Sequence, residues 1–191
     1  MIKLLSTFTP KNAQIAMSTR MDRINKDWHE PALWLYMVVV FGHWLEHIIQ
    51  AYQVFILGWA RPDAGGVLGL WFPALASSEL LHFAYNLLLF VGLWALRPAF
   101  RGRSRLFWNV ALALQGWHFV EHLLLQLQWL SGYYLFGASQ QMGIGQLWLP
   151  RVELHFLYNS IVFIPMVLGL FYHLYPPQSG SGRAPCSCTR H

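Results

Sequence analysis

Charged residues are scarce in this chain of 191 residues. Asp, Glu, Lys and Arg make up 11% of it and hydrophobic residues make up 55%, whereas about a quarter of a typical soluble domain is charged. This scarcity excludes an ordinary soluble globular domain. The net charge of +5 is not gathered into a basic domain, and this excludes a nucleic-acid-binding protein.

Cysteine is almost absent. The two cysteines, Cys186 and Cys188, fall in a Pro/Gly/Ser-rich stretch that begins at Pro176, and this composition predicts a disordered cytoplasmic tail over 176–191. Thiols on the cytoplasmic side stay reduced, so a disulfide framework is excluded. A Cys-x-Cys followed by His191 is a possible metal-binding group, but the composition favours a plain tail.

Much of the remaining sequence consists of long apolar runs. Leu80–Leu96 and Leu154–Tyr175 contain no charged residue, and two further runs contain one glutamate each. A helix needs about 20 such residues to cross ~30 Å of hydrocarbon, and only helix satisfies its own backbone groups there. We therefore predict an all-α integral membrane protein with a bundle of four transmembrane helices, at roughly 32–58, 77–97, 105–130 and 152–175.

The positions of the basic residues indicate an orientation. They are concentrated in the N-terminal segment 1–30 and in the connection 97–105, while each of the other two connections holds a single arginine. Because basic loops stay in the cytoplasm, we expect both termini and 97–105 to be cytoplasmic. The expected location is a bacterial cytoplasmic membrane, with 59–76 and 131–151 on its outer side.

The chain contains an internal duplication. Three segments recur at offsets of 75, 77 and 73 residues: HWLEHIIQAYQ (43–53) as HFVEHLLLQLQ (118–128), GLWFP (69–73) as QLWLP (146–150), and LHFAYNLLLF (81–90) as LHFLYNSIVF (154–163). Each copy holds two helices, so both have the same orientation. The pattern predicts two tandem parallel repeats, 31–97 and 98–175, related by a pseudo-twofold axis along the membrane normal.

The two copies share titratable residues inside the apolar segments. Each first helix carries His-x-x-Glu-His, and each second helix carries His-Phe-x-Tyr-Asn. The candidate metal ligands are His43, Glu46, His47, His82, His118, Glu121, His122 and His155. Spacings of three and four residues place them on one face of each helix. Tyr85, Asn86, Tyr158 and Asn159 lie within one turn of a candidate ligand and suit hydrogen bonding that would orient it.

The depths of these residues also agree. At a rise of ~1.5 Å per residue, Glu46 and His47 lie about 20 Å above the cytoplasmic boundary, and His82 lies about 9 Å below the outer one. In a core of ~30 Å these are the same level. The sequence therefore predicts that six histidines and two glutamates meet in one layer.

The buried glutamates favour a metal in that layer. A carboxylate at the centre of a lone helix costs at least about 2.5 kcal/mol and needs a cation, a donor or a proton. No Lys or Arg is predicted at the depth of Glu46 or Glu121. Imidazole with carboxylate is a ligand set for iron, zinc or manganese, and the spans contain no cysteine that would suit Cu(I).

The His-x-x-Glu-His segments resemble the zinc motif of the inverzincin peptidases. In those enzymes two histidines bind the metal and the glutamate acts as the base. The resemblance covers five residues on each of two helices, and those peptidases are soluble with one motif per site. It implies that this spacing can hold a metal.

Two repeats that meet at a twofold axis suggest two non-haem metal ions, with iron favoured and zinc as the alternative. Such a centre would suit an oxidoreductase acting on an apolar or quinone-like molecule, because the layer is rich in aromatic residues and no separate nucleophile or phosphate-binding loop is evident. Three other interpretations stay open: a b-type cytochrome with bis-histidine haem b, a proton or metal-ion pathway, and purely structural interhelical hydrogen bonds. The sequence does not predict an oligomeric state.

Overall fold

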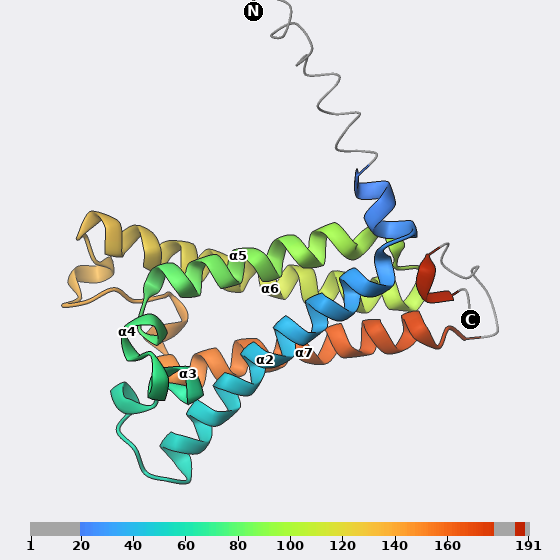
Figure 1. Cartoon of the computed structure of the whole chain (residues 1–191). Helices are drawn as coiled ribbons and strands as arrows, with labels where there is room; N and C mark the ends of the chain where they lie inside the picture. Colours follow the sequence, from blue (N-terminus) through green and yellow to red (C-terminus); the bar gives the residue numbers. More distant parts are fainter. Residues whose placement is uncertain (1–19, 178–185, 190–191) are drawn as a thin grey trace, which may run out of the picture.

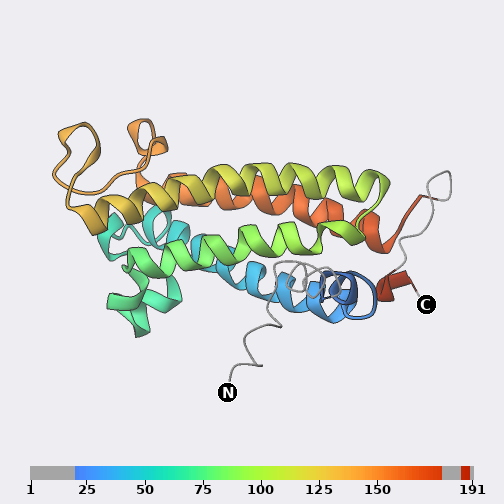
Figure 2. The same cartoon turned by 90° about the horizontal axis from the view of Figure 1, so that it is seen from above.

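Four long helices lie side by side in the computed structural model, which describes residues 20–177 and 186–189. They are α2 (His29–Phe55), α5 (Glu79–Leu96), α6 (Gly102–Ser131) and α7 (Arg151–Leu174). Helix α6 packs against α5 and α7, and α2 packs against the same two helices (Figures 1 and 2). The described residues contain helices and no strand, which confirms the all-α prediction.

The two ends of the bundle differ. At one end, here named the terminal end, lie the start of α2, the end of α7 and both described ends of the chain (Figure 2). A helical turn over residues 20–26 precedes α2 there, and the 3₁₀ turns η2 (Arg97–Ala99) and η5 (Ser187–Thr189) lie at the same end.

The opposite end, named the connection end, carries the two long connections. The first contains η1 (Arg61–Asp63), α3 (Gly66–Trp71) and α4 (Pro73–Ala76). The second contains η3 (Leu135–Gly137) and η4 (Gly145–Leu147).

Local signals set the helix limits. The Ser78 hydroxyl accepts a hydrogen bond from the Leu81 N–H (3.3 Å) and so caps the start of α5, as expected of an N-cap serine. Helix α6 ends at Gly132, which adopts the left-handed conformation with φ of 70°. Glycine adopts this conformation without the steric cost of a Cβ atom.

Three helices are long and apolar enough to cross a membrane: α2, residues Glu79–Ala99 and α7. The fourth predicted span, α6, has the length but falls short in apolar composition. The reason is that many of its buried residues are polar, namely Gln115, His118, Glu121, His122, Gln126 and Gln128. These side chains face the other helices or the second connection, and they lower the average hydropathy of α6.

The terminal half of the bundle has an apolar core. Its fully buried members include Leu33, Leu93, Phe100 and Trp108. The Trp108 Nε1–H donates to the Leu93 carbonyl at 2.8 Å, so the one polar atom of this side chain is satisfied. This packing holds the four helices together in the terminal half of the bundle.

The predicted disordered tail needs a correction at residues 186–189. There the chain forms η5, and Cys186, only 1% exposed, packs on Ala99 at the terminal end. The Cys186 thiol also contacts the His173 ring (Sγ to Nε2, 3.4 Å). Composition alone suggested disorder, because it carries no information about these contacts. His191 lies outside the described residues.

Candidate metal centres

The structure brings the six histidines of the two repeats into one cluster, here named the histidine layer. It consists of His43 and His47 from α2, His82 from α5, His118 and His122 from α6, and His155 from α7. Ring centroids of neighbouring members lie 4.5 to 6.2 Å apart, and the contacts run from α2 through α7 to α5 and α6. Members from all four long helices therefore meet at one level.

Two of these imidazoles have a fixed tautomer. In each, Nδ1 lies against a backbone carbonyl, which can only accept a hydrogen bond: His82 on Ser78 O (2.8 Å) and His155 on Arg151 O (2.7 Å). Nδ1 must therefore carry the proton. In the neutral ring this leaves a lone pair on Nε2, which is the form that binds metals.

The Nε2 atoms face one another. His43 and His47 approach to 3.1 Å between their Nε2 atoms, and His122 and His155 approach to the same distance. Two nitrogens bound to one tetrahedral ion are separated by about 3.3 Å, given metal–nitrogen bonds of about 2.0–2.1 Å. Each pair therefore has a spacing that one ion would produce.

The group His118, His122 and His155 has the strongest ligand character. All three residues are buried, and their ligand atoms lie within 4.8 Å of one another. Both ring nitrogens of His118 and Nδ1 of His122 are buried without a hydrogen-bond partner among the described residues. Buried polar atoms are rarely left in this condition, and an ion bound in this group would satisfy one nitrogen of His118.

The two glutamates have other partners than those predicted. The Glu46 carboxylate accepts hydrogen bonds from the backbone N–H groups of Val67 (2.7 Å) and Leu68 (3.2 Å), at the start of α3. The Glu121 carboxylate accepts one from the Gly145 N–H (3.0 Å) in the second connection. Both carboxylates therefore fasten a connection to a long helix through backbone donors, while the second oxygen of Glu121, Oε2, is buried without a hydrogen-bond partner among the described residues.

Glycine makes this fastening possible in both connections. A Cβ atom at Gly66 or at Gly143 would lie 2.1 Å from the Oε2 atom of Glu46 or Glu121, respectively. Gly66 also has φ of +70°. Any larger residue at these positions would displace the carboxylate.

A glutamine supports each connection beside the glutamate. Gln53 exchanges hydrogen bonds with the backbone of Gly66 (2.9 and 3.3 Å). Gln128 donates to the Met142 carbonyl (2.8 Å) and accepts from the Leu135 N–H (2.9 Å). Thus each first helix of a predicted repeat binds its own connection through one glutamate and one glutamine.

The predicted orienting residues lie beside the histidines but act differently. Asn86 and Asn159 donate to the backbone carbonyls of His82 (3.0 Å) and His155 (2.8 Å), rather than to an imidazole or carboxylate. Tyr85 stacks on His43 with centroids 4.1 Å apart.

Tyr158 lies 4.8 Å from the His118 ring, again measured between centroids, and accepts a hydrogen bond from Trp117 Nε1–H (2.9 Å). The two tyrosines therefore limit ring movement by packing.

Two ion pairs join the predicted repeats: one links the first residues of α5 and α7, and the other links the first connection to α7. Arg151 binds Glu79 (2.8 Å), which is 5% exposed, and Arg61 binds Glu153. The neighbouring Glu153 carboxylate raises the pKa of the exposed Arg61 side chain. Glu79 and Glu153 are therefore partners of arginines.

Two cavities border the histidine layer. One, of about 480 Å³, lies at the connection end and is lined by polar residues that include Arg61, Arg151 and His155. The other, of about 510 Å³, lies between α2 and α5, where Val38, Leu68 and Leu81 are among its walls. His47 and His82 line both cavities.

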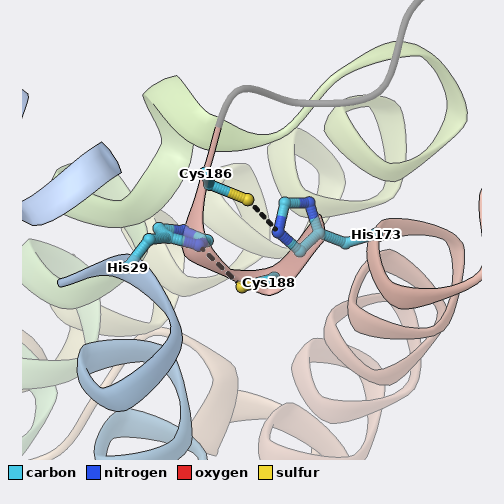
Figure 3. A group of neighbouring side chains, drawn as sticks. All are labelled: His29, His173, Cys186 and Cys188. Carbon is cyan, nitrogen blue, oxygen red and sulfur yellow. Dashed lines mark hydrogen bonds between the residues drawn. The ribbon is translucent and has the colours of Figure 1, made fainter. Parts of the chain in front are cut away.

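A second cluster of potential ligands lies at the terminal end. The sequence indicated its two cysteines but not its two histidines. His29, His173, Cys186 and Cys188 place their ligand atoms within 4.8 Å of one another, and Figure 3 shows these side chains converging from α2, α7 and the tail. The Cys188 Sγ lies 3.3 Å from His29 Nδ1. Hydrogen bonding to Cys188 holds the pKa of the Cys186 thiol well below its usual range.

One signal in the sequence pointed to this cluster. The predicted topology places the start of the first helix and the end of the last one on the same side as the tail. A histidine at each of these positions was therefore within reach of the Cys-x-Cys.

Comparisons with known proteins give no relative. No family model matches the chain, and neither a curated protein nor a solved structure matches it.

Proposed function

We propose that the chain is an integral membrane protein whose histidine layer binds two non-haem metal ions, favouring iron, with zinc as the alternative. The proposed activity is that of an oxidoreductase acting on an apolar or quinone-like molecule. One observation carries the proposal: imidazoles from all four long helices converge in one layer, with Nε2 atoms 3.1 Å apart in two pairs and three buried ligand atoms within 4.8 Å of one another. Imidazole is the ligand that iron and zinc share.

The proposed architecture has α6 as the fourth span, with two tandem parallel repeats. Helix α6 is 30 residues long and packs beside α5 and α7 (Figure 2). Its buried polar residues face those helices or the second connection, so lipid would meet its apolar remainder. Corresponding residues of the two copies make the same kind of contact, which supports the duplication. Glu46 and Glu121 each accept from a backbone N–H of their own connection, and Asn86 and Asn159 each donate to a histidine carbonyl one turn earlier.

The cavity between α2 and α5 supports an apolar substrate. Its walls combine apolar residues such as Val38 and Leu81 with His43 and His47 of the layer. Small-molecule sites have this composition, with few polar groups on mostly apolar walls. A molecule bound there would contact the imidazoles of α2 directly.

The terminal half of the bundle disfavours a through pathway for ions. On the terminal side of the layer, a void of about 10 Å³ lies between the helices beside Tyr36, Gln115 and Met166. That is about the volume a single water needs. A centre with access from the connection end fits this packing better than a conduit does.

Metal analysis and an optical spectrum of the purified full chain in detergent test the proposal. We expect the double variant His47→Ala/His122→Ala to lose up to two metal ions per chain relative to the parent. Val120→Ala, on the exposed face of α6, is the matched control and should keep them. Equal metal content in both variants would return the histidines to a structural role, and a Soret band would identify haem instead.

A further inference from the structure

The second cluster has the composition of a closed metal site. His29, at the first residue of α2, and His173, in the last turn of α7, meet two thiols of the tail. Two cysteines and two histidines form a complete tetrahedral set for Zn²⁺, with no position left for water or substrate. The thiols exclude Ca²⁺ and Mg²⁺, which take oxygen ligands.

The distances within the cluster agree with such a site. Sγ of Cys188 lies 3.3 Å from Nδ1 of His29, and Sγ of Cys186 lies 3.4 Å from Nε2 of His173. Around one tetrahedral Zn²⁺, a sulfur at about 2.3 Å and a nitrogen at about 2.0–2.1 Å are separated by roughly 3.5 Å. These two pairs therefore already have about the separation that a shared ion would give them, and all four ligand atoms lie within 4.8 Å of one another.

Burial adds a second, independent reason. His29 is 0% exposed, His173 is 3% exposed and Cys186 is 1% exposed. Phe100 lies against both rings, with centroids at 5.6 Å and 4.4 Å, so the cluster is shielded from solvent on that side.

Other contacts also hold the described part of the tail at this place. The Ser187 hydroxyl accepts a hydrogen bond from the Glu30 N–H (3.0 Å), Cys186 packs on Ala99, and Cys188 packs on the apolar core. Fixing the backbone of each residue costs about 1–2 kcal/mol of conformational entropy, and thiols form weak hydrogen bonds. A metal–ligand bond set provides free energy that such contacts lack.

We propose that His29, His173, Cys186 and Cys188 bind one structural Zn²⁺ that fastens the tail across the ends of α2 and α7. The ion ties the first long helix to the last one at the end opposite the connections. It is independent of the histidine layer, which contains no sulfur ligand. The predicted cytoplasmic side is a compartment in which both thiols stay reduced.

Cobalt substitution tests the site in the full chain. After chelation, Co²⁺ is added under reducing conditions, and thiolate-to-cobalt charge-transfer absorption is recorded, because the histidine layer cannot produce it. We expect this absorption to saturate at one Co²⁺ per chain and to be displaced by Zn²⁺. Cys186→Ser/Cys188→Ser should abolish it, and His29→Ala or His173→Ala should weaken Zn²⁺ binding by more than the ~10–100-fold typical of residues outside the ligand set.

Two control variants give the measurement its specificity. His47→Ala/His122→Ala should keep the full charge-transfer signal, since those residues belong to the histidine layer. His191→Ala should keep it too. Absence of the signal in the parent chain, or its loss in His191→Ala with retention in His29→Ala, would overturn the proposed ligand set.

Alkylation gives a second readout that does not depend on cobalt. Zn²⁺ should slow the reaction of both thiols with a maleimide at least tenfold in the parent chain. The protection should disappear in His173→Ala. Equal alkylation rates with and without Zn²⁺ in the parent chain would contradict the proposal.

Discussion

A carboxylate within an apolar helix needs a partner, and backbone N–H groups fill this role at Glu46 and Glu121. The Glu46 carboxylate takes two donors from the first turn of α3, where the helix leaves its N–H groups unpaired. The negative charge is also favourable at that end of a helix. The glutamates thus position the connections that cover the histidine layer.

Replacing the glutamates by glutamine separates anchoring from metal binding. In Glu46→Gln/Glu121→Gln each side chain keeps one acceptor oxygen but loses its charge, and hydrogen bonds to charged groups contribute about 1.5–3 kcal/mol. We expect faster amide hydrogen exchange at Val67, Leu68 and Gly145, with the bound metal retained.

Asp63→Asn removes an exposed carboxylate from the first connection and serves as the control. We expect it to leave the amide hydrogen exchange rates of the parent chain unchanged. Loss of metal without a change in amide exchange would instead identify Glu46 and Glu121 as ligands.

The positions of the histidines could be predicted from the sequence, whereas the partners of the glutamates could not, and the difference has a physical cause. Helical spacing and depth placed His47, His82 and His155 at one level, because a helix fixes where its side chains lie. The donors to Glu46 belong to an irregular connection, and backbone N–H groups leave no mark in the sequence. His29 and Cys188 lie 159 residues apart, beyond the reach of any local pattern.

At the scale of the elements, two ion pairs of unequal burial join the two predicted repeats. Glu79 has a side chain only 3% exposed and its partner Arg151 is 34% exposed, while Arg61 and Glu153 are 51% and 18% exposed. Exposed pairs contribute about 0–1 kcal/mol, whereas breaking a dry buried pair costs about 3–5 kcal/mol. The first pair borders the polar cavity and belongs between these limits.

These two pairs form a matched comparison. We expect Arg151→Ala to lower the free energy of unfolding by about 1–3 kcal/mol, since it leaves the Glu79 carboxylate buried with Gln141 as its remaining partner. Arg61→Ala should cost less than about 1 kcal/mol. Unfolding of both variants in detergent gives the measurement. Equal losses would show that burial of Glu79 does not set the strength of its pair.

At the scale of the whole molecule, the main question is whether α6 crosses the membrane together with the three more apolar helices. With four spans, both termini and the connection 97–101 lie on one side, and residues 56–78 and 132–150 lie on the other. With α6 outside the membrane, 97–101 and 132–150 would lie on the same side. The arginines of 97–105 predict the first arrangement.

Single cysteines introduced into a Cys186→Ser/Cys188→Ser background distinguish these arrangements. We expect a membrane-impermeant maleimide, applied from outside to intact cells, to label Trp71→Cys and Trp148→Cys. Arg101→Cys should react only after the cells are opened. Labelling of Arg101→Cys in intact cells would reverse the proposed orientation. Labelling of Trp148→Cys only in opened cells, with Trp71→Cys labelled in intact ones, would remove α6 from the membrane.

The two ion pairs have a consequence for the origin of the proposed duplication. Arg61 of the first proposed repeat binds Glu153 of the second, and Arg151 of the second binds Glu79 of the first. These residues do not occupy equivalent positions, because the offset of 73 residues aligns Glu79 with Val152 and Arg151 with Ser78. Around a twofold axis between two identical units, each pair would have occurred twice. If the copies arose by duplication, they have therefore diverged at these positions, as they have at Gln50 and Leu125.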